Sequence, residues 1–432
     1  MILWDLPVWF VWFELFLFGA CIGSFLNVAI YRLPLHEDIW QAWKGLGHPP
    51  STCPFCKKRI LAIDNVPVLG WMWLRGRCRF CRHSIPFRYP MVEFLNGALW
   101  VLLYALLVPA DWQATINDSA VYSPLLPLAQ PAWIAQPPAQ EVWLHLRFLY
   151  YLVLMEALVV ATFIDFDLQI IPDSVTAPAA AVGLLGSLTG VMWLVPVWFQ
   201  DPIHLNGVWW QFDPNGLPPA WMLVHIPKWI AAHPVLHGLA VSLAGAIVGG
   251  GMIWFMRIIG HWVFRREAMG FGDVTLMAMI GTFLGWQPMI LIPFVACTVA
   301  LIAVVGRGMF RPGREIPFGP YLSIATMLVL LSWKWLFPVM QRYYELGVFL
   351  IAFAILTAIM LTGLLWLTQG VKWMLGIPLY EPDFVEEWTS ADQLTFFANK
   401  DPHAGVGPMS PVRWPGEHAG RGRTHEQRWR KG

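Results

Sequence analysis

Four of the six cysteines form two close pairs whose spacing is typical of a metal site. Cys53 and Cys56 make one Cys-x2-Cys motif, Cys78 and Cys81 make a second, and 21 residues separate them. In a zinc ribbon, two tight turns of this kind supply four thiolates to one tetrahedral zinc ion. Flanking Lys and Arg side chains are expected to lower the thiol pKa values. The sequence predicts a closed structural zinc site, with two reduced or disulfide-bonded pairs as the alternative.

Two aspartates are the second set of residues that could do chemistry. Asp165 lies at the end of an apolar run, and Asp273 follows Gly270 and Gly272 at the start of another. Carboxylates at the edge of hydrocarbon are costly, so a functional role is the default hypothesis. Two carboxylates held together share a proton and can activate water against a peptide bond. Capping of helix ends is the alternative, because apposition across 108 residues cannot be read from the sequence.

The composition indicates that membrane helices position these residues. Only 13% of the 432 residues are charged and 57% are apolar, with 27 Trp and 27 Phe. The apolar residues form runs of roughly 20, the length that crosses about 30 Å of hydrocarbon. An ordinary cytosolic enzyme is therefore excluded. The net charge of +1 gives no overall field that would attract a nucleic acid, so no nucleic-acid partner is expected.

Nine apolar runs predict an all-α, polytopic membrane protein with a cysteine-containing loop after the first helix. The runs lie at about Val8–Ile30, Tyr89–Ala110, Leu146–Ile164, Val175–Phe199, Val235–Ile259, Val274–Trp286, Pro288–Val305, Tyr321–Phe337 and Gly347–Leu367. The first run has no Lys or Arg before it and is too long for the apolar region of a signal peptide. We therefore predict a retained first helix.

The distribution of Lys and Arg predicts the orientation, because positive residues stay on the cytoplasmic side. Residues 31–88 contain ten Lys and Arg against three acids, whereas residues 109–142 contain no Lys or Arg. The N-terminus is thus expected outside, and the cysteine loop and C-terminal tail inside. The basic loop is expected to contact anionic lipid head groups. Pro, Gly and charged residues predict a disordered end of the tail.

A series of motifs in order resembles the type IV prepilin peptidases. In the amino-terminal half they are Gly23–Val28, Arg32–Pro34, the two cysteine motifs, Asp64–Leu69, Arg75–Cys78, Arg88–Pro90 and Glu93. In the second half they are Ile164–Asp165, Ile171–Asp173, Glu267–Asp273 and Ile316–Tyr321. The resemblance covers roughly residues 18–330, and several independent motifs are more specific than a lone Gly-x-Gly-Asp.

The resemblance implies an intramembrane aspartic endopeptidase of the bacterial inner membrane. Such an enzyme removes the basic leader of type IV prepilins or type II secretion pseudopilins after a Gly. The resemblance also implies methylation of the new N-terminus with S-adenosylmethionine, although no glycine-rich loop identifies the residues that bind this cofactor. It assigns catalysis to Asp165 and Asp273. Thr275 departs from the family, which usually has Lys at this position.

Three acidic residues near this pair are predicted to bind the basic leader by charge attraction: Asp167, Asp173 and Glu267. For Asp167 and Asp173, helix capping and local hydrogen bonding are the alternative. The predicted domains are an amino-terminal domain at 1–110, which contains the loop at 31–88, and a peptidase domain at 146–337. An additional helix is predicted at 338–369 and a polar tail at 370–432.

Two other functional classes remain open on the sequence alone. In a zinc-ribbon-bearing transporter, the membrane carboxylates would form an ion or proton pathway, which requires them near mid-membrane. In a structural protein of a pilus or secretion machine, an inactive site would tolerate Asp165→Asn. The sequence does not indicate an oligomeric state.

Overall fold

The computed structural model describes eleven stretches of the chain. They are residues 7–36, 38–47, 50–53, 55–108, 139–190, 192–195, 197, 233–264, 269–306, 317–344 and 349–375. The described residues form helices and two isolated β-bridges, without a named strand. The prediction of an all-α membrane fold is confirmed.

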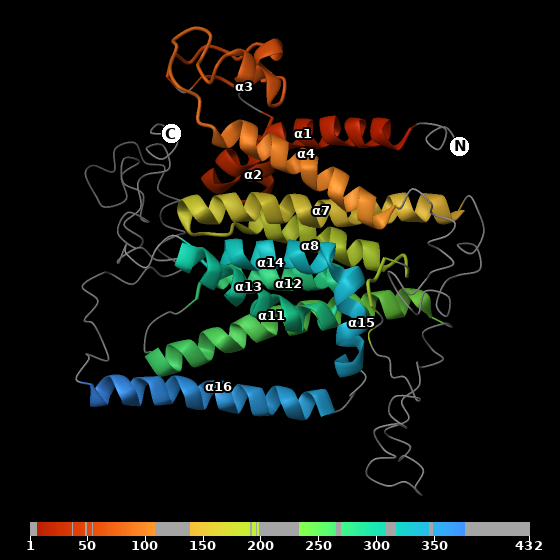
Figure 1. Ribbon diagram of the computed structural model, residues 1–432, viewed down its shortest axis with the longest axis vertical. Coiled ribbons are helices and arrows are strands. Elements are labelled where there is room, and N and C mark those ends of the chain that lie inside the picture. The colour runs from red at the N-terminus through yellow and green to blue at the C-terminus, as the bar shows by residue number, and fades with distance from the viewer. Residues whose placement is uncertain are drawn as a thin grey trace, which may run out of the picture.

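Most of the helices lie side by side in one bundle, and the cysteine loop projects from one end of it (Figure 1). The bundle helices are α1 (Val8–Arg32), α4 (Arg88–Leu107), α7 (Ala139–Leu168), α8 (Asp173–Ser187), α11 (Pro234–Phe264), α12 (Phe271–Leu284), α13 (Trp286–Gly306), α14 (Gly319–Leu331), α15 (Trp333–Tyr344) and α16 (Phe349–Met374). Between α1 and α4 the chain forms the short helices η1 (Leu33–Leu35), α2 (Ile39–Gly45), η2 (Ala62–Asn65) and α3 (Leu69–Trp73).

Six described helices are long and apolar enough to cross a membrane. They include α1, α4, most of α7, α11, α13 and α16, whereas α12 and α14 are shorter apolar helices. At a rise of about 1.5 Å per residue, the 13 residues of α14 span only about 20 Å. The number of nine crossings therefore remains a prediction.

Two of the predicted runs are longer than the helices that occupy them. α8 ends at Ser187, and the chain then turns at Gly190, whose φ is 74°. The run expected at Tyr321–Phe337 is divided between α14 and α15, which point in clearly different directions (Figure 1). Ser332 lies at this break, and its hydroxyl donates to the carbonyl of Leu328. A serine that bonds the carbonyl four residues earlier bends a helix.

The core of the bundle surrounds α7, whose most apolar window is 78% buried. Its side chains pack with those of α12 and α14 in one hydrophobic cluster. α11 and α12 approach closely because glycines face each other: a Cβ on Gly245 would lie 2.0 Å from the carbonyl oxygen of Gly281. Only residues without a Cβ permit this contact. The packing fixes the ends of α7, α12 and α14, where the chemical motifs lie.

These motif-bearing ends lie on the left in Figure 1, and the cysteine loop, at the top of the view, joins α1 and α4 at their left ends. The connections α7–α8, α11–α12 and α13–α14 are all at this end. This arrangement is the one that alternating membrane crossings require. Which end faces the cytoplasm remains a prediction.

Candidate active site and metal centre

Asp165 and Asp273 come from neighbouring helices and are both buried. Asp165 lies three residues before the end of α7, and Asp273 is the third residue of α12. Their exposed fractions are 5% and 8%. The charge of Asp273 acts on Asp165, so the two carboxylates are within electrostatic range of each other. The fold thus brings together two acids that are 108 residues apart in the chain.

Packing around Ile171 explains how three motifs meet at this point. A Cβ on Gly272 would lie 3.0 Å from the Cβ of Ile171, and one on Gly319 would lie 2.8 Å from its Cδ1. The same Cβ on Gly319 would lie 2.6 Å from Oδ2 of Asp165. The backbone of Gly319 therefore packs directly against the Asp165 carboxylate. The sequence does not single out Gly319, although this residue lies within the motif Ile316–Tyr321.

Asp167 has a partner within the protein. Its carboxylate forms an ion pair with Arg88, the first residue of α4. Arg88 also donates to the carbonyl of Phe163 at 3.3 Å, and its guanidinium lies 4.8 Å from the Phe163 ring centroid. Asp167 therefore connects α7 to the chain segment that follows the cysteine loop.

The other predicted site residues differ in their placement. Asp173 is exposed at the first position of α8, where the helix dipole favours a negative charge. Glu267 falls in 265–268, outside the described residues. The Thr275 hydroxyl donates to the carbonyl of Gly272 at 3.0 Å, within the first turn of α12. Leader binding by the three acids Asp167, Asp173 and Glu267 stays a prediction.

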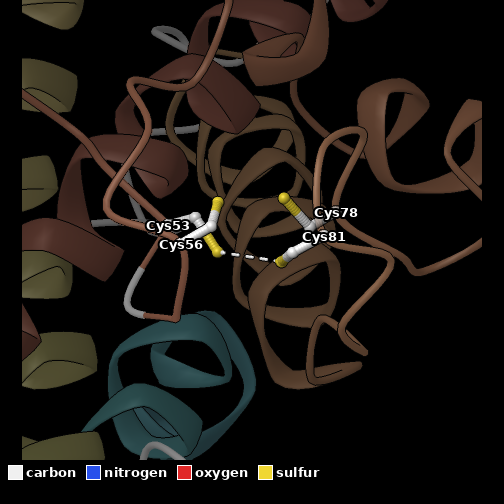
Figure 2. A group of neighbouring side chains, drawn as sticks. All are labelled: Cys53, Cys56, Cys78 and Cys81. Carbon is white, nitrogen blue, oxygen red and sulfur yellow. Dashed lines mark hydrogen bonds between the residues drawn. The ribbon is translucent and has the colours of Figure 1, made fainter.

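The four cysteines of the paired motifs converge on one point (Figure 2). All four Sγ atoms lie within 4.8 Å of one another, and those of Cys53 and Cys81 are 3.8 Å apart. Two sulfurs on a tetrahedral zinc are about 3.8 Å apart for Zn–S bonds of about 2.3 Å, whereas a disulfide needs about 2.05 Å. All six cysteines lie in the described part of the chain and are free. This donor set fits a four-thiolate metal site and not two disulfides.

The two cysteine motifs have the same backbone conformation. The N–H of Cys53 donates to the carbonyl of Lys58 at 2.9 Å, and the N–H of Cys78 donates to that of His83 at 2.8 Å. The residue after each second cysteine has a positive φ: 56° at Lys57 and 62° at Arg82. Each motif is thus a tight turn that directs both of its thiols to the same side.

Aromatic contacts join the two turns reciprocally. Phe55, inside the first motif, stacks on His83, which follows the second, with ring centroids 3.2 Å apart. Phe80, inside the second motif, lies under the ammonium of Lys58, which follows the first, at 4.9 Å. The turns are therefore related by an approximate two-fold symmetry.

The surroundings of the thiols affect Cys53 and Cys78 differently. Burial is the main influence on Cys53 and raises the pKa of its thiol to about 11. For Cys78, burial acts to raise the pKa, but hydrogen bonds from the backbone of Cys81 and Phe80 lower it to about 7. The expectation that flanking Lys and Arg residues lower the thiol pKa values is not confirmed, since the backbone is the main lowering influence at Cys78.

Comparisons with known proteins show which family this chain resembles. The Bacterial Peptidase A24 N-terminal domain matches residues 17–107, which include the four cysteines. The Type IV leader peptidase family matches residues 217–305, which include Asp273 but not Asp165. The prepilin leader peptidase/N-methyltransferase of Aeromonas hydrophila is 30% identical over 347 residues, covering 75% of this chain and 91% of that protein. The protein of the same name from Pectobacterium carotovorum subsp. carotovorum is 28% identical over 342 residues, covering 74% and 91%. No solved structure matches.

Together with several membrane-length helices, these matches define a multi-pass peptidase of the inner membrane. The chain belongs to the prepilin leader peptidase/N-methyltransferase family. It is therefore a prepilin peptidase that also has methyltransferase activity.

Proposed function

We propose that Asp165 and Asp273 form an aspartic pair that removes the basic leader of a type IV prepilin or a type II secretion pseudopilin after a Gly. The observation that carries this proposal is the electrostatic interaction between two buried carboxylates from different helices. Like charges at close range do not both ionise readily, so the pair is expected to hold one proton. One carboxylate then acts as a base while the other acts as an acid.

In this mechanism, the ionised carboxylate takes a proton from a water molecule that attacks the scissile carbonyl. The protonated carboxyl donates to the carbonyl oxygen, and the leaving amine takes up a proton as the peptide bond breaks. Gly319 packs against the Asp165 carboxylate and so restricts its orientation. Burial of both acids limits access of bulk water and strengthens their electrostatic effects.

The basic leader is expected to reach the pair from the cytoplasmic surface. This requires the N-terminus outside and the C-terminal tail inside. Of the acids predicted to bind the leader, Asp173 is exposed, whereas Asp167 is already paired with Arg88. Asp173 is therefore the more accessible of these two for a leader side chain.

We also propose that the metal held by Cys53, Cys56, Cys78 and Cys81 is zinc. Zinc supplies a positive charge that stabilises four thiolates and cross-links the two turns of the loop. Four protein ligands fill a tetrahedral site, so its role would be structural.

The peptidase hypothesis is favoured over the transporter hypothesis. A pathway across the membrane requires carboxylates at mid-depth, whereas Asp165 and Asp273 lie at helix ends. The relatives are also named as enzymes. The hypothesis of an inactive structural protein does not explain why three motifs converge at Ile171.

The test is co-expression with a prepilin and mass measurement of the N-terminus of the product, which reports leader removal and methylation together. Asp165→Asn and Asp273→Asn should each abolish leader removal, with the protein still in the membrane. Glu14→Gln, in α1, is the matched control and should cleave normally. Cleavage that persists in both aspartate variants would overturn the assignment.

A further inference from the structure

A cavity of about 530 Å³ lies between the cysteine loop and the adjacent ends of α1 and α4. Its wall includes Ser24, Asn27 and Tyr31 of α1 together with Tyr89 and Glu93 of α4. Apart from Val28 of α1 and Pro90 of α4, the remaining described wall comes from residues 32–86, and the aspartate pair is not part of it. The volume is in the range of pockets that hold small-molecule cofactors.

Asn27 offers this cavity an acceptor without a partner. Its side chain is only 4% exposed, and its Nδ2 donates to the carbonyl of Tyr89 at 3.1 Å. Its Oδ1 has no hydrogen-bond partner among the described residues. A buried acceptor without a partner is destabilising, so a ligand N–H donor would be favoured there.

Charged groups of both signs line the same cavity. Glu93 is partly buried, and its Oε2 accepts a hydrogen bond from the N–H of Val68 at 2.6 Å. The exposed side chains of Lys57 and Arg59 lie elsewhere on its wall. The aromatic residues of the wall, among them Trp71, provide flat apolar surfaces. A ligand with a purine, a cationic centre and a carboxylate would find complementary groups here.

We propose that this cavity binds S-adenosylmethionine, the methyl donor of the family's second activity. Asn27 accepts a hydrogen bond from the adenine amino group, and Glu93 faces the sulfonium. Lys57 and Arg59 bind the carboxylate of the ligand. The inference deepens the proposed function, because the methyl acceptor is the amine that leader removal creates. It does not depend on which residues cut the peptide bond.

The start of α4 places this cavity beside the aspartate segment. Tyr89 lines the cavity, and the preceding residue, Arg88, is paired with Asp167. An N-terminal amine has a pKa of about 8, so part of it is neutral at physiological pH. The neutral amine gives its electron pair to the methyl carbon, while the carbon–sulfur bond breaks and leaves its pair on sulfur. The products are a methylated ammonium and a neutral thioether.

The cavity is a poor site for the leader itself. Its described wall contains five Lys or Arg residues and only two acids. A peptide rich in Lys and Arg would be repelled by this excess of positive charge. An anionic lipid head group would be attracted by it, and the test below separates this outcome from the proposed one.

The test uses the full chain in discs of uncharged lipid and calorimetric titration with two probes. S-Adenosylhomocysteine has a neutral sulfur, whereas sinefungin has a cationic amine near the sulfonium position. Glu93→Gln should weaken sinefungin binding about tenfold, corresponding to about 1.4 kcal/mol, and S-adenosylhomocysteine binding much less. Asn27→Leu should weaken both probes to a similar extent. Glu14→Gln, outside the cavity, should bind both probes normally.

Unchanged affinities in both cavity variants, at wild-type melting temperatures, would overturn the proposal. Displacement of both probes by soluble phosphatidylglycerol in wild-type protein, together with unchanged probe affinities in Asn27→Leu, would identify a lipid site and also overturn it. Asp165→Asn should retain probe binding. Cleavage by that variant would refute the aspartic mechanism alone, whereas normal probe binding would still support the cavity assignment.

Discussion

Arg88, at the start of α4, forms an ion pair with Asp167, near the end of α7. The pair is about four-fifths buried on both sides, with side-chain exposures of 21% and 18%. A second contact joins the same regions, because the indole N–H of Trp43 donates to the carbonyl of Ser174 at 2.9 Å. The region around the cysteine loop is therefore attached directly to the segment that carries Asp165.

Loss of the ion pair should impair peptide cleavage. Arg88→Ala leaves the Asp167 carboxylate partly buried without its ion-pair partner, and we expect leader removal to slow about tenfold. Since the partners act as a unit, adding Asp167→Asn should cause less than the sum of the single effects. The measurement is a double-mutant cycle on cleavage rate. Lys44→Ala, which removes a cation from the exposed Trp40 ring, is the control. Additive effects of the Arg88 and Asp167 variants would refute direct coupling.

Gly319→Ala should reduce cleavage strongly. The added Cβ would lie 2.6 Å from the Asp165 carboxylate, so that side chain must move, and we expect at least about a hundredfold loss of rate. Gly272→Ala should be milder, because its nearest contact is 3.0 Å, with Ile171. Gly251→Ala, where a Cβ meets nothing within 4 Å, is the control and should cleave normally. Wild-type rates in Gly319→Ala would contradict this role.

Metal content should depend on the clustered cysteines only. Elemental analysis of purified protein should give one zinc per chain, and Cys53→Ser should lose it because three thiolates no longer close the site. Cys21→Ser and Cys297→Ser change cysteines outside the cluster and should keep the metal. Chelation should lower the melting temperature, since metal binding stabilises the folded loop. A protein with two disulfides and no metal would refute the zinc site.

Glu156 should matter for stability more than for catalysis. Its Oε1 accepts hydrogen bonds from Asn96 at 3.0 Å and from the Trp100 indole at 2.6 Å, which joins α7 to α4. Glu156→Ala would leave both donors without this acceptor, at a cost of about 1–3 kcal/mol each. Thermal unfolding should show a lower melting temperature, with cleavage unchanged below the transition. Glu14→Ala is the control, and an equal shift in both variants would contradict a specific role.

The sequence predicted the composition of the cysteine cluster because all four cysteines lie within one loop. Each tight turn already brings two thiols together, so the four thiols form one cluster once the two turns contact each other. The hydrophobic runs likewise predicted the membrane helices, because the length of hydrocarbon constrains them directly. Charge next to the thiols was a poor guide to their pKa values, since backbone N–H groups within the turns dominate the lowering at Cys78.

The meeting of Asp165 and Asp273 depends on contacts that the sequence does not display. It requires the backbones of α11 and α12 to touch at Gly245 and Gly281, and Gly319 to fit against Asp165. The sequence around a glycine in a membrane helix does not reveal which residue that glycine contacts in the folded protein. The sequence also does not predict the division of the expected run at Ser332, because a serine inside an apolar run does not by itself end a helix.

Helix α16 forms few contacts with the rest of the described bundle. Its most apolar window is 0% buried, and Trp366 meets Trp262 of α11 with ring centroids 5.8 Å apart. Most of its neighbours in a bilayer would be acyl chains. An unrelated membrane helix could therefore replace α16 without disturbing the packing around Asp165 and Asp273 or the cysteine cluster, which makes α16 a suitable position for attaching a reporter.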